Sequence, residues 1–234
     1  MRRVAVVTGA GRGIGRSVAI ALSRAGDQVV ITSRSESELG STAETIRAHG
    51  GQVEAIVGDL RETQTIDRLF DRANARFGPV TLLINNAADL ERAPIEDSRP
   101  EQFDRTIDLN IRAAFLAARR AFEDMRRARG GCIVNMASLS GVYGVEKFPG
   151  MAPYIVSKFG MVGLTEALAV EGAPHGIRAV CLAPGAVDTA LLKKALPGLR
   201  AGVTPDEIAR LIVFLAGDAG VALNGLTIPL FSNA

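Results

Sequence analysis

Histidine, cysteine and long apolar runs are all scarce in this chain of 234 residues. Its two histidines, His49 and His175, stand far apart and follow no metal-ligand spacing, so the sequence gives no basis for a metal site. Cys132 and Cys181 each lie inside an apolar run, and we expect them to be buried, reduced thiols in strands. No apolar run approaches the ~18 residues of a membrane span.

A marked excess of charge of either sign is also missing. The chain has 27 Lys and Arg against 25 Asp and Glu, which leaves a net charge of +2. This balance gives no basic surface for nucleic acid or for a membrane. The apolar stretch after Arg3 is too short for a secretory signal. We therefore expect a soluble, cytoplasmic protein whose partners include neither nucleic acids nor membranes.

Short apolar runs alternate with helical patterns along the whole chain. The runs lie at residues 3–8, 29–32, 53–57, 82–84, 132–136, 179–183 and 226–230. The helical patterns between them include a Ser35-x-x-Glu38 capping box and one long helix at about 101–128. Continuous apolar strands separated by helices indicate a parallel sheet covered on both faces. We predict a single α/β domain over residues 1–234, a Rossmann-like doubly wound sheet of seven mostly parallel strands.

Residues 8–15 form a glycine-rich turn between the first expected strand and the first helix. They read Thr-Gly-Ala-Gly-Arg-Gly-Ile-Gly. In a doubly wound fold this turn binds a dinucleotide pyrophosphate, because glycines let the backbone approach and the helix start supplies free N–H groups. Arg16 and Ser17 follow, so the phosphate-loop lysine is missing. The alternative is a turn that only joins strand to helix.

Tyr154 and Lys158 stand four residues apart in an expected helix that begins at Pro153, with Ser138 upstream. Residues at this spacing lie on the same helix face. An ammonium favours the phenolate, so we expect the pKa of Tyr154 to fall below its usual value of about 10. Such a phenol can exchange a proton near neutral pH. Taken alone, the pair is ordinary on an exposed helix face, but the glycine turn favours a catalytic role.

The order of these motifs resembles that of the short-chain dehydrogenase/reductases, from the first expected strand to the last. The matching residues are Thr8, Gly9, Gly13, Gly15, Asp59, Asn85-Asn86-Ala87, Asn110, Ser138, Tyr154, Lys158, Pro184-Gly185 and Thr189. In general pattern the chain is most similar to the 3-oxoacyl-carrier-protein reductases. The resemblance implies a nicotinamide cofactor that supplies a hydride, while the protein supplies positioning and a proton.

The resemblance also implies roles for individual residues. Tyr154 would donate the proton to a carbonyl oxygen that Ser138 also binds, and Lys158 would bind the nicotinamide ribose. Asn110 would support a water-mediated proton relay. The expected cofactor-binding residues are Gly9, Gly11, Arg12, Gly13, Ile14, Gly15, Ser33, Arg34, Asp59, Leu60, Asn86, Ala87, Tyr154, Lys158, Pro184, Gly185, Val187 and Thr189.

Three of these residues have structural alternatives. Asn110 could only bend its helix, and Ser138 could only cap a turn, with Ser140 as a rival. Asp59 could be a helix N-cap in place of an adenine contact.

The end of the second expected strand bears on the choice between NAD and NADP. An acid there accepts the ribose 2′-hydroxyl of NAD, whereas arginine accommodates the 2′-phosphate of NADP. The strand ends Thr32-Ser33-Arg34 without a carboxylate, and Arg12 can reach the same phosphate from the glycine turn. We therefore expect NADP(H). The alternative is that both arginines face solvent and that Glu36 is the ribose partner.

The chain departs from the family pattern at several positions. Ala88 replaces a usual glycine, and Val180-Cys181 replaces a common Asn-Ala pair. The sequence ends at residues 231–234 without the usual Asp-Gly-Gly tail, which casts doubt on the familiar tetramer. The segment at 190–203, expected to cover the substrate, is short and suggests an open or adaptable site.

The substrate and the assembly are less well defined by the sequence. The expected pocket walls are mainly apolar and comprise Leu139, Val145, Phe148, Met151, Leu191 and Leu192. Lys193 and Lys194 could meet a carboxylate or an acidic carrier, or form a solvated helix face. Surplus apolar residues on the helices that carry Asn110 and Tyr154 suggest contact between subunits, hence a homodimer or homotetramer.

We therefore predict an NADP(H)-dependent oxidoreductase that interconverts a ketone and a secondary alcohol, with a small, mainly apolar carbonyl or alcohol substrate. Two alternatives keep the fold. One is a non-catalytic nucleotide-sensing regulator, although such proteins typically lose the tyrosine or the lysine that this chain retains. The other is an epimerase or dehydratase that uses the same site.

Overall fold

Seven strands form one sheet in the order β3-β2-β1-β4-β5-β6-β7 in the computed structural model, which describes residues 2–231. The strands are β1 (Val4–Thr8), β2 (Gln28–Ser33), β3 (Val53–Val57), β4 (Leu82–Asn85), β5 (Gly131–Met136), β6 (Ile177–Pro184) and β7 (Thr227–Leu230). Every neighbouring pair is parallel, so the prediction of a doubly wound parallel sheet is confirmed.

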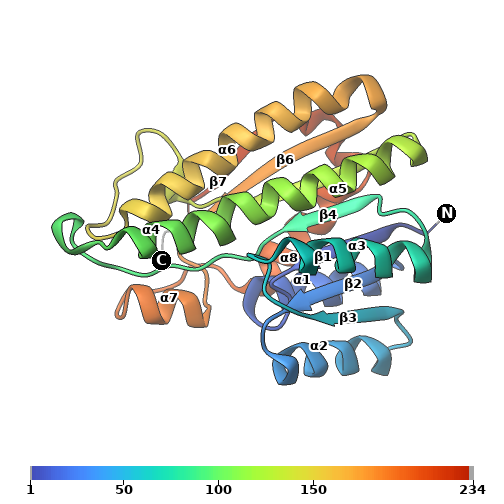
Figure 1. The fold of residues 1–234 in the computed structure, drawn as a ribbon, viewed down its shortest axis with the longest axis horizontal. Helices are drawn as coiled ribbons and strands as arrows, with labels where there is room; N and C mark the ends of the chain where they lie inside the picture. Colours follow the sequence, from blue (N-terminus) through green and yellow to red (C-terminus); the bar gives the residue numbers. More distant parts are fainter. Residues whose placement is uncertain (1, 232–234) are drawn as a thin grey trace.

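Helices cover both faces of this sheet (Figure 1). They are α1 (Gly13–Arg24), α2 (Glu36–Ala48), α3 (Thr63–Phe77), α4 (Pro100–Ile107), α5 (Ala113–Ala128), α6 (Ala152–Gly172), α7 (Ala190–Ala195) and α8 (Pro205–Ala216). Successive strand residues point to opposite faces. In β1, Ala5 and Val7 pack in the core under α1, α2 and α8, whereas Val4 and Val6 pack under α3, α5 and α6. Both faces of the sheet are therefore buried, as the continuous apolar runs predict.

Local sequence signals explain several element boundaries. Thr204 caps α8 by accepting a hydrogen bond of 3.3 Å from the Glu207 N–H, and the Glu207 carboxylate accepts one of 2.8 Å from the Thr204 N–H. Ser35 caps α2 in the same way by accepting from the Glu38 N–H at 3.3 Å. The Glu38 carboxylate instead pairs with Arg12.

The prediction of one long helix over 101–128 is wrong, because this segment is not one continuous α-helix. The α4 segment ends at Ile107, and a π-helical turn at Asp108–Arg112 precedes α5. Asn110 lies in this turn, and its side chain binds the backbone N–H and carbonyl of Asp89 at 2.8 and 3.0 Å. Turns of this kind insert one residue into a helix and often occur at functional sites. Apolar periodicity continues on both sides of the turn and therefore did not reveal it.

The strand order reverses at β1, which has β2 on one side and β4 on the other. The loops that leave β1 and β4 therefore diverge, and a crevice opens outside the carboxyl ends of the strands. Cys132 and Cys181 are buried, free thiols in β5 and β6, as expected. Across residues 2–231, none of the helices combines the length and apolarity needed to cross a membrane. The missing Asp-Gly-Gly tail noted in the sequence concerns residues 231–234, of which 232–234 lie outside the described residues.

Candidate active site

A cavity of about 890 Å³ opens at the carboxyl ends of the strands. Its lining includes every predicted cofactor-binding residue except Gly15. Of the predicted catalytic residues, Ser138, Tyr154 and Lys158 line it, whereas Asn110 is buried outside the lining. The topology thus brings together residues from both halves of the chain.

The glycine turn forms a close-fitting cradle at one end of the cavity. Gly9 has a φ of +67°, and a Cβ there would lie 2.9 Å from the Cα of Ala87. A side chain at this position would therefore be strained and would also clash. A Cβ on Gly15 would overlap the carbonyl oxygen of Gly9, so Gly15 allows α1 to pack against the turn. These features fit the close approach of a pyrophosphate to backbone N–H groups at the start of α1.

Thr8 and Asn86 fix this cradle to the loop after β4. The Thr8 hydroxyl oxygen accepts hydrogen bonds from the N–H groups of Asn86 and Ala87 at 3.0 and 3.1 Å. The Asn86 side chain donates to the carbonyl oxygens of Thr8 and Gly9 at 2.9 and 3.2 Å. The two loops that border the crevice are therefore held at a fixed separation.

The Tyr154 phenol is buried at the centre of the cavity wall. Burial raises its pKa to about 12, although a side-chain hydrogen bond with Ser138 acts in the opposite direction. The sequence-based expectation was a pKa below 10. The structure gives the opposite direction because desolvation outweighs the Ser138 hydrogen bond. The Lys158 Nζ lies 5.3 Å from the ring centroid. Tyr154 therefore holds its proton at neutral pH.

Lys158 is buried behind this phenol and is anchored to the sheet. Its Nζ donates a hydrogen bond of 2.8 Å to the carbonyl oxygen of Met136 at the end of β5. Burial lowers the Lys158 pKa to about 8. A Cβ on Gly141 would lie 2.5 Å from the Lys158 carbonyl oxygen, so only glycine lets the turn after β5 pack this closely on α6.

Ser138 is the N-cap of the turn after β5, which is the 3₁₀ segment Leu139–Gly141. Its hydroxyl oxygen accepts from the Ser140 N–H at 3.2 Å, so the capping alternative is also observed. The cap fixes the Ser138 side chain beside Tyr154 and uses only its oxygen, so the hydroxyl proton is available for the hydrogen bond with the Tyr154 phenol. Capping and a catalytic role are therefore compatible.

Asn110 supports the site from outside the cavity. Its Nδ2 lies 3.0 Å from the Ser157 hydroxyl, which in turn donates to the Tyr154 carbonyl oxygen at 2.7 Å. Through Asp89 and Ser157, Asn110 ties the loop after β4 to the first turns of α6.

Two arginines and one carboxylate line the cavity near the end of β2. Arg34 directly follows the strand, Arg12 lies in the glycine turn, and Glu38 lies in the first turn of α2. Arg12 Nη1 lies 3.2 Å from Glu38 Oε1. Sequence reasoning proposed Glu36 as the acidic alternative, but the carboxylate from α2 that lines the cavity is Glu38. The Ser35-x-x-Glu38 spacing could have indicated this role of Glu38, because it places the residue in the first turn of α2, directly after β2.

Asp59 lies at the adenine end of the predicted cofactor site. Its carboxylate accepts from the Arg61 backbone N–H at 3.0 Å and from the Arg61 side chain. The arginine holds the Asp59 pKa below its usual value. The N-cap of α3 is Glu62, so the helix-cap alternative for Asp59 is wrong.

The other half of the cavity is mainly apolar. All six expected wall residues line it: Leu139, Val145, Phe148, Met151, Leu191 and Leu192. Arg92, which the sequence did not single out, donates to the carbonyl oxygens of Ala195 and Pro149 at 3.1 and 2.9 Å. It thereby ties the end of α7 to the loop that precedes α6. Lys193 pairs with Asp188 at 2.8 Å on an exposed surface, which favours the solvated-face alternative.

Clusters of three or more His, Cys, Asp or Glu side chains that could hold a metal ion do not occur within residues 2–231. The polar groups of the lining include the Tyr154 phenol, the Lys158 ammonium, the Ser138 hydroxyl and the charged side chains of Arg12, Arg34 and Glu38.

Comparison with known proteins agrees with this geometry. Residues 3–199 match the family model described as short chain dehydrogenase. The chain is 31% identical to D-threitol dehydrogenase of Mycolicibacterium smegmatis, over 95% of this chain and 89% of that protein. It is also 31% identical to a 3-oxoacyl-[acyl-carrier-protein] reductase of Staphylococcus epidermidis, over 97% of both chains.

A solved structure is similar over nearly the same length. This is gluconate 5-dehydrogenase of Burkholderia cenocepacia in complex with NADP and tartrate, at 29% identity and a TM-score of 0.90, covering 98% of this chain and 94% of that one. The chain belongs to the short-chain dehydrogenase family and is an oxidoreductase of the kind that acts on alcohol or ketone substrates.

Proposed function

We propose that this protein uses NADP(H) to interconvert a ketone and a secondary alcohol, with Tyr154 as the proton donor. The observation that carries the proposal is the buried Tyr154 phenol in the cavity wall. The phenol is hydrogen-bonded to Ser138, and the Lys158 Nζ lies 5.3 Å from the centroid of its ring. The glycine cradle, whose close contacts a Cβ would fill, supports a dinucleotide at the other end of the cavity.

A bound nicotinamide cofactor supplies the hydride. The protein's own groups manage the proton. With its pKa raised to about 12, Tyr154 is protonated at neutral pH and can donate to a carbonyl oxygen. Ser138 binds the same oxygen, and the Lys158 ammonium stabilises the phenolate as it forms. In alcohol oxidation the phenolate accepts the proton instead.

NADP(H) is supported by two guanidinium groups near the end of β2, that of Arg34 directly after the strand and that of Arg12 in the glycine turn. Arg12 and Arg34 both line the cavity there, and guanidinium groups bind phosphate well. The substrate that fits the apolar wall is a ketone with an apolar body, and 3-oxoacyl compounds are one such class. The hydroxyl-bearing substrates of some relatives make a polar substrate the main competing outcome.

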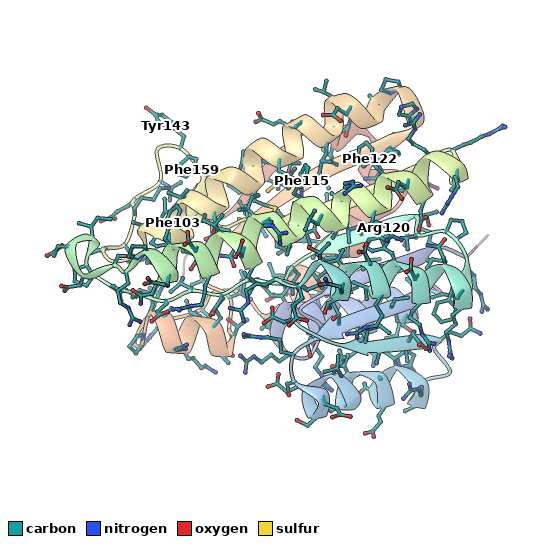
Figure 2. All side chains as sticks on the ribbon, in the orientation of Figure 1. Phe103, Phe115, Arg120, Phe122, Tyr143 and Phe159 are labelled. Carbon is teal, nitrogen blue, oxygen red and sulfur yellow. The ribbon has the colours of Figure 1, made fainter. Side chains whose placement is uncertain are left out.

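We also propose that two copies associate through α4, α5 and α6. Figure 2 shows Phe103, Phe115 and Phe159 along this face, and Phe115 and Phe159 remain 52% and 39% exposed. Large apolar side chains on adjoining helices favour contact with a matching face on a second copy. A homotetramer would need a further surface. The cytoplasmic location and the single domain over residues 1–234 remain predictions from the sequence.

A panel of ketones tested with purified protein and NADPH provides the experiment. We expect at least one apolar ketone to cause loss of nicotinamide absorbance that depends on the protein. If every ketone of the panel, polar and apolar, leaves NADPH unconsumed while the protein binds NADPH, the proposed reaction is wrong.

A further inference from the structure

We infer that Glu38 is a specificity-determining residue of the cofactor site, because it competes with a 2′-phosphate for the Arg12 guanidinium. The inference rests on the proposed function, in which this end of the cavity holds the 2′-phosphate of NADP. Glu38 lowers the affinity for NADP, so the preference for NADP over NAD is weaker than Arg12 and Arg34 alone would give.

The Arg12, Arg34 and Glu38 side chains all line the cavity near the end of β2. Arg12 Nη1 and Glu38 Oε1 are 3.2 Å apart, and both residues line the cavity together with Arg34. A Cβ on Gly11 would lie 2.8 Å from the Ser33 hydroxyl oxygen and 3.2 Å from the Cβ of Glu38. The Glu38 side chain therefore starts in contact distance of the glycine turn that carries Arg12.

Glu38 cannot leave this position by a movement of its helix alone. The Thr42 hydroxyl, one turn further along α2, donates to the carbonyl oxygen of Ala10 at 3.0 Å. Ser35 caps the same helix at the Glu38 N–H. The Thr42 contact thus holds α2 against the glycine turn, and the cap orders its first turn. Release of Arg12 therefore takes a rotation of the Glu38 side chain.

The pair is exposed enough to break at little cost. The Arg12 and Glu38 side chains are 68% and 38% exposed, so water screens their attraction. Exposed ion pairs contribute little to stability. The carboxylate therefore does not block NADP, but a phosphate must displace it from Arg12. The glutamate thus reduces the affinity gained from Arg12 and leaves NAD, which lacks the phosphate, unaffected.

The test compares Glu38→Gln with Glu36→Gln in the otherwise intact protein. Both substitutions remove one negative charge from the first turn of α2, but Glu36 is exposed and not part of the described cavity lining. Dissociation constants for NADPH and NADH are measured by fluorescence titration. We expect Glu38→Gln to tighten NADPH binding roughly two- to fivefold, the scale of one exposed ion pair, with NADH unchanged. Glu36→Gln should change neither constant.

The same Glu38→Gln substitution made in an Arg12→Ala protein separates competition for Arg12 from a general effect of the removed charge. In Arg12→Ala the gain from Glu38→Gln should shrink, because no guanidinium remains to be released. An equal gain in both backgrounds, an equal effect of the two glutamine variants, or weakened NADH binding in Glu38→Gln would overturn the inference.

The same titrations keep this inference distinct from the proposed cofactor. Wild-type protein without any NADPH preference, combined with a selective gain in Glu38→Gln, would overturn the proposed NADP dependence and support the competition. A clear wild-type preference for NADPH with no gain in Glu38→Gln would do the reverse.

Discussion

The Lys158 Nζ donates a hydrogen bond of 2.8 Å to the carbonyl oxygen of Met136, which anchors a buried ammonium of α6 to the end of β5. Burial lowers the Lys158 pKa to about 8. The group that supports the Tyr154 phenolate is therefore held at a cost to folding, because water would solvate the charge better in the unfolded chain.

This cost predicts a pH dependence of stability. Between about pH 8 and pH 10.5 the unfolded chain binds a proton at Lys158 that the folded chain has lost. The contribution of Lys158 to stability therefore rises with pH in this window, and its cost is fully present below pH 8. Relative to a Lys158→Met variant, the wild-type free energy of unfolding should increase by roughly 2 kcal/mol between pH 7 and pH 10.

Urea unfolding at several pH values measures this difference. Above pH 10 the raised pKa of Tyr154 acts in the opposite direction, so the comparison stops there. Lys194→Met, at an exposed lysine of α7, is the matched control and should run parallel to wild type. A pH-independent difference between wild type and Lys158→Met would contradict the burial argument.

The preference for NADP(H) predicts a selective effect of Arg34→Ala. A charge-assisted hydrogen bond to a phosphate contributes roughly 1.5–3 kcal/mol, so NADPH binding should weaken about tenfold or more. NADH binding should stay nearly unchanged, because the 2′-phosphate is missing. Arg47→Ala, at the exposed end of α2, the helix that follows Arg34, controls for loss of positive charge. Equal loss for both cofactors would remove Arg34 from the phosphate site.

The proposed subunit contact predicts a change of molecular mass. Light scattering of wild type at micromolar concentration should give at least twice the chain mass of 24.6 kDa. A Phe115→Ser, Phe159→Ser double variant should shift toward the monomer, since it removes both exposed rings from the α5–α6 face. Phe214→Ser changes a similarly exposed ring on α8 and should still give at least a dimer. A wild-type monomer would exclude the contact.

The sequence predicted the strands and most helices well because their signals are local. The Ser35-x-x-Glu38 signal predicted a helix start, and α2 begins directly after Ser35, because all residues of this signal are contiguous in the chain. The π-helical turn at Asn110 was missed because its cause is tertiary: hydrogen bonds to Asp89 and Ser157.

The same distinction holds in the site. The spacing of the motifs predicted most of the residues that line the cavity, although Gly15 and Asn110 lie outside the lining. Glu38, which lines the cavity, and Arg92, which contacts two segments beside it, were missed. Their partners come from other elements, Arg12 for Glu38, and Ala195 and Pro149 for Arg92. The direction of the Tyr154 pKa was also wrong, because spacing revealed the ammonium but not the extent of burial.

Steady-state kinetics of Tyr154→Phe test the central claim most directly. The chain has two tyrosines, and Tyr143 is 93% exposed, so Tyr143→Phe is the matched control. We expect Tyr154→Phe to lower kcat for ketone reduction by at least ~10²–10⁴-fold, the range for a positioned acid, with NADPH affinity nearly unchanged. Tyr143→Phe should behave as wild type. A Tyr154→Phe protein that binds NADPH normally and keeps most of its ketone reduction would contradict the assignment of Tyr154 as the proton donor.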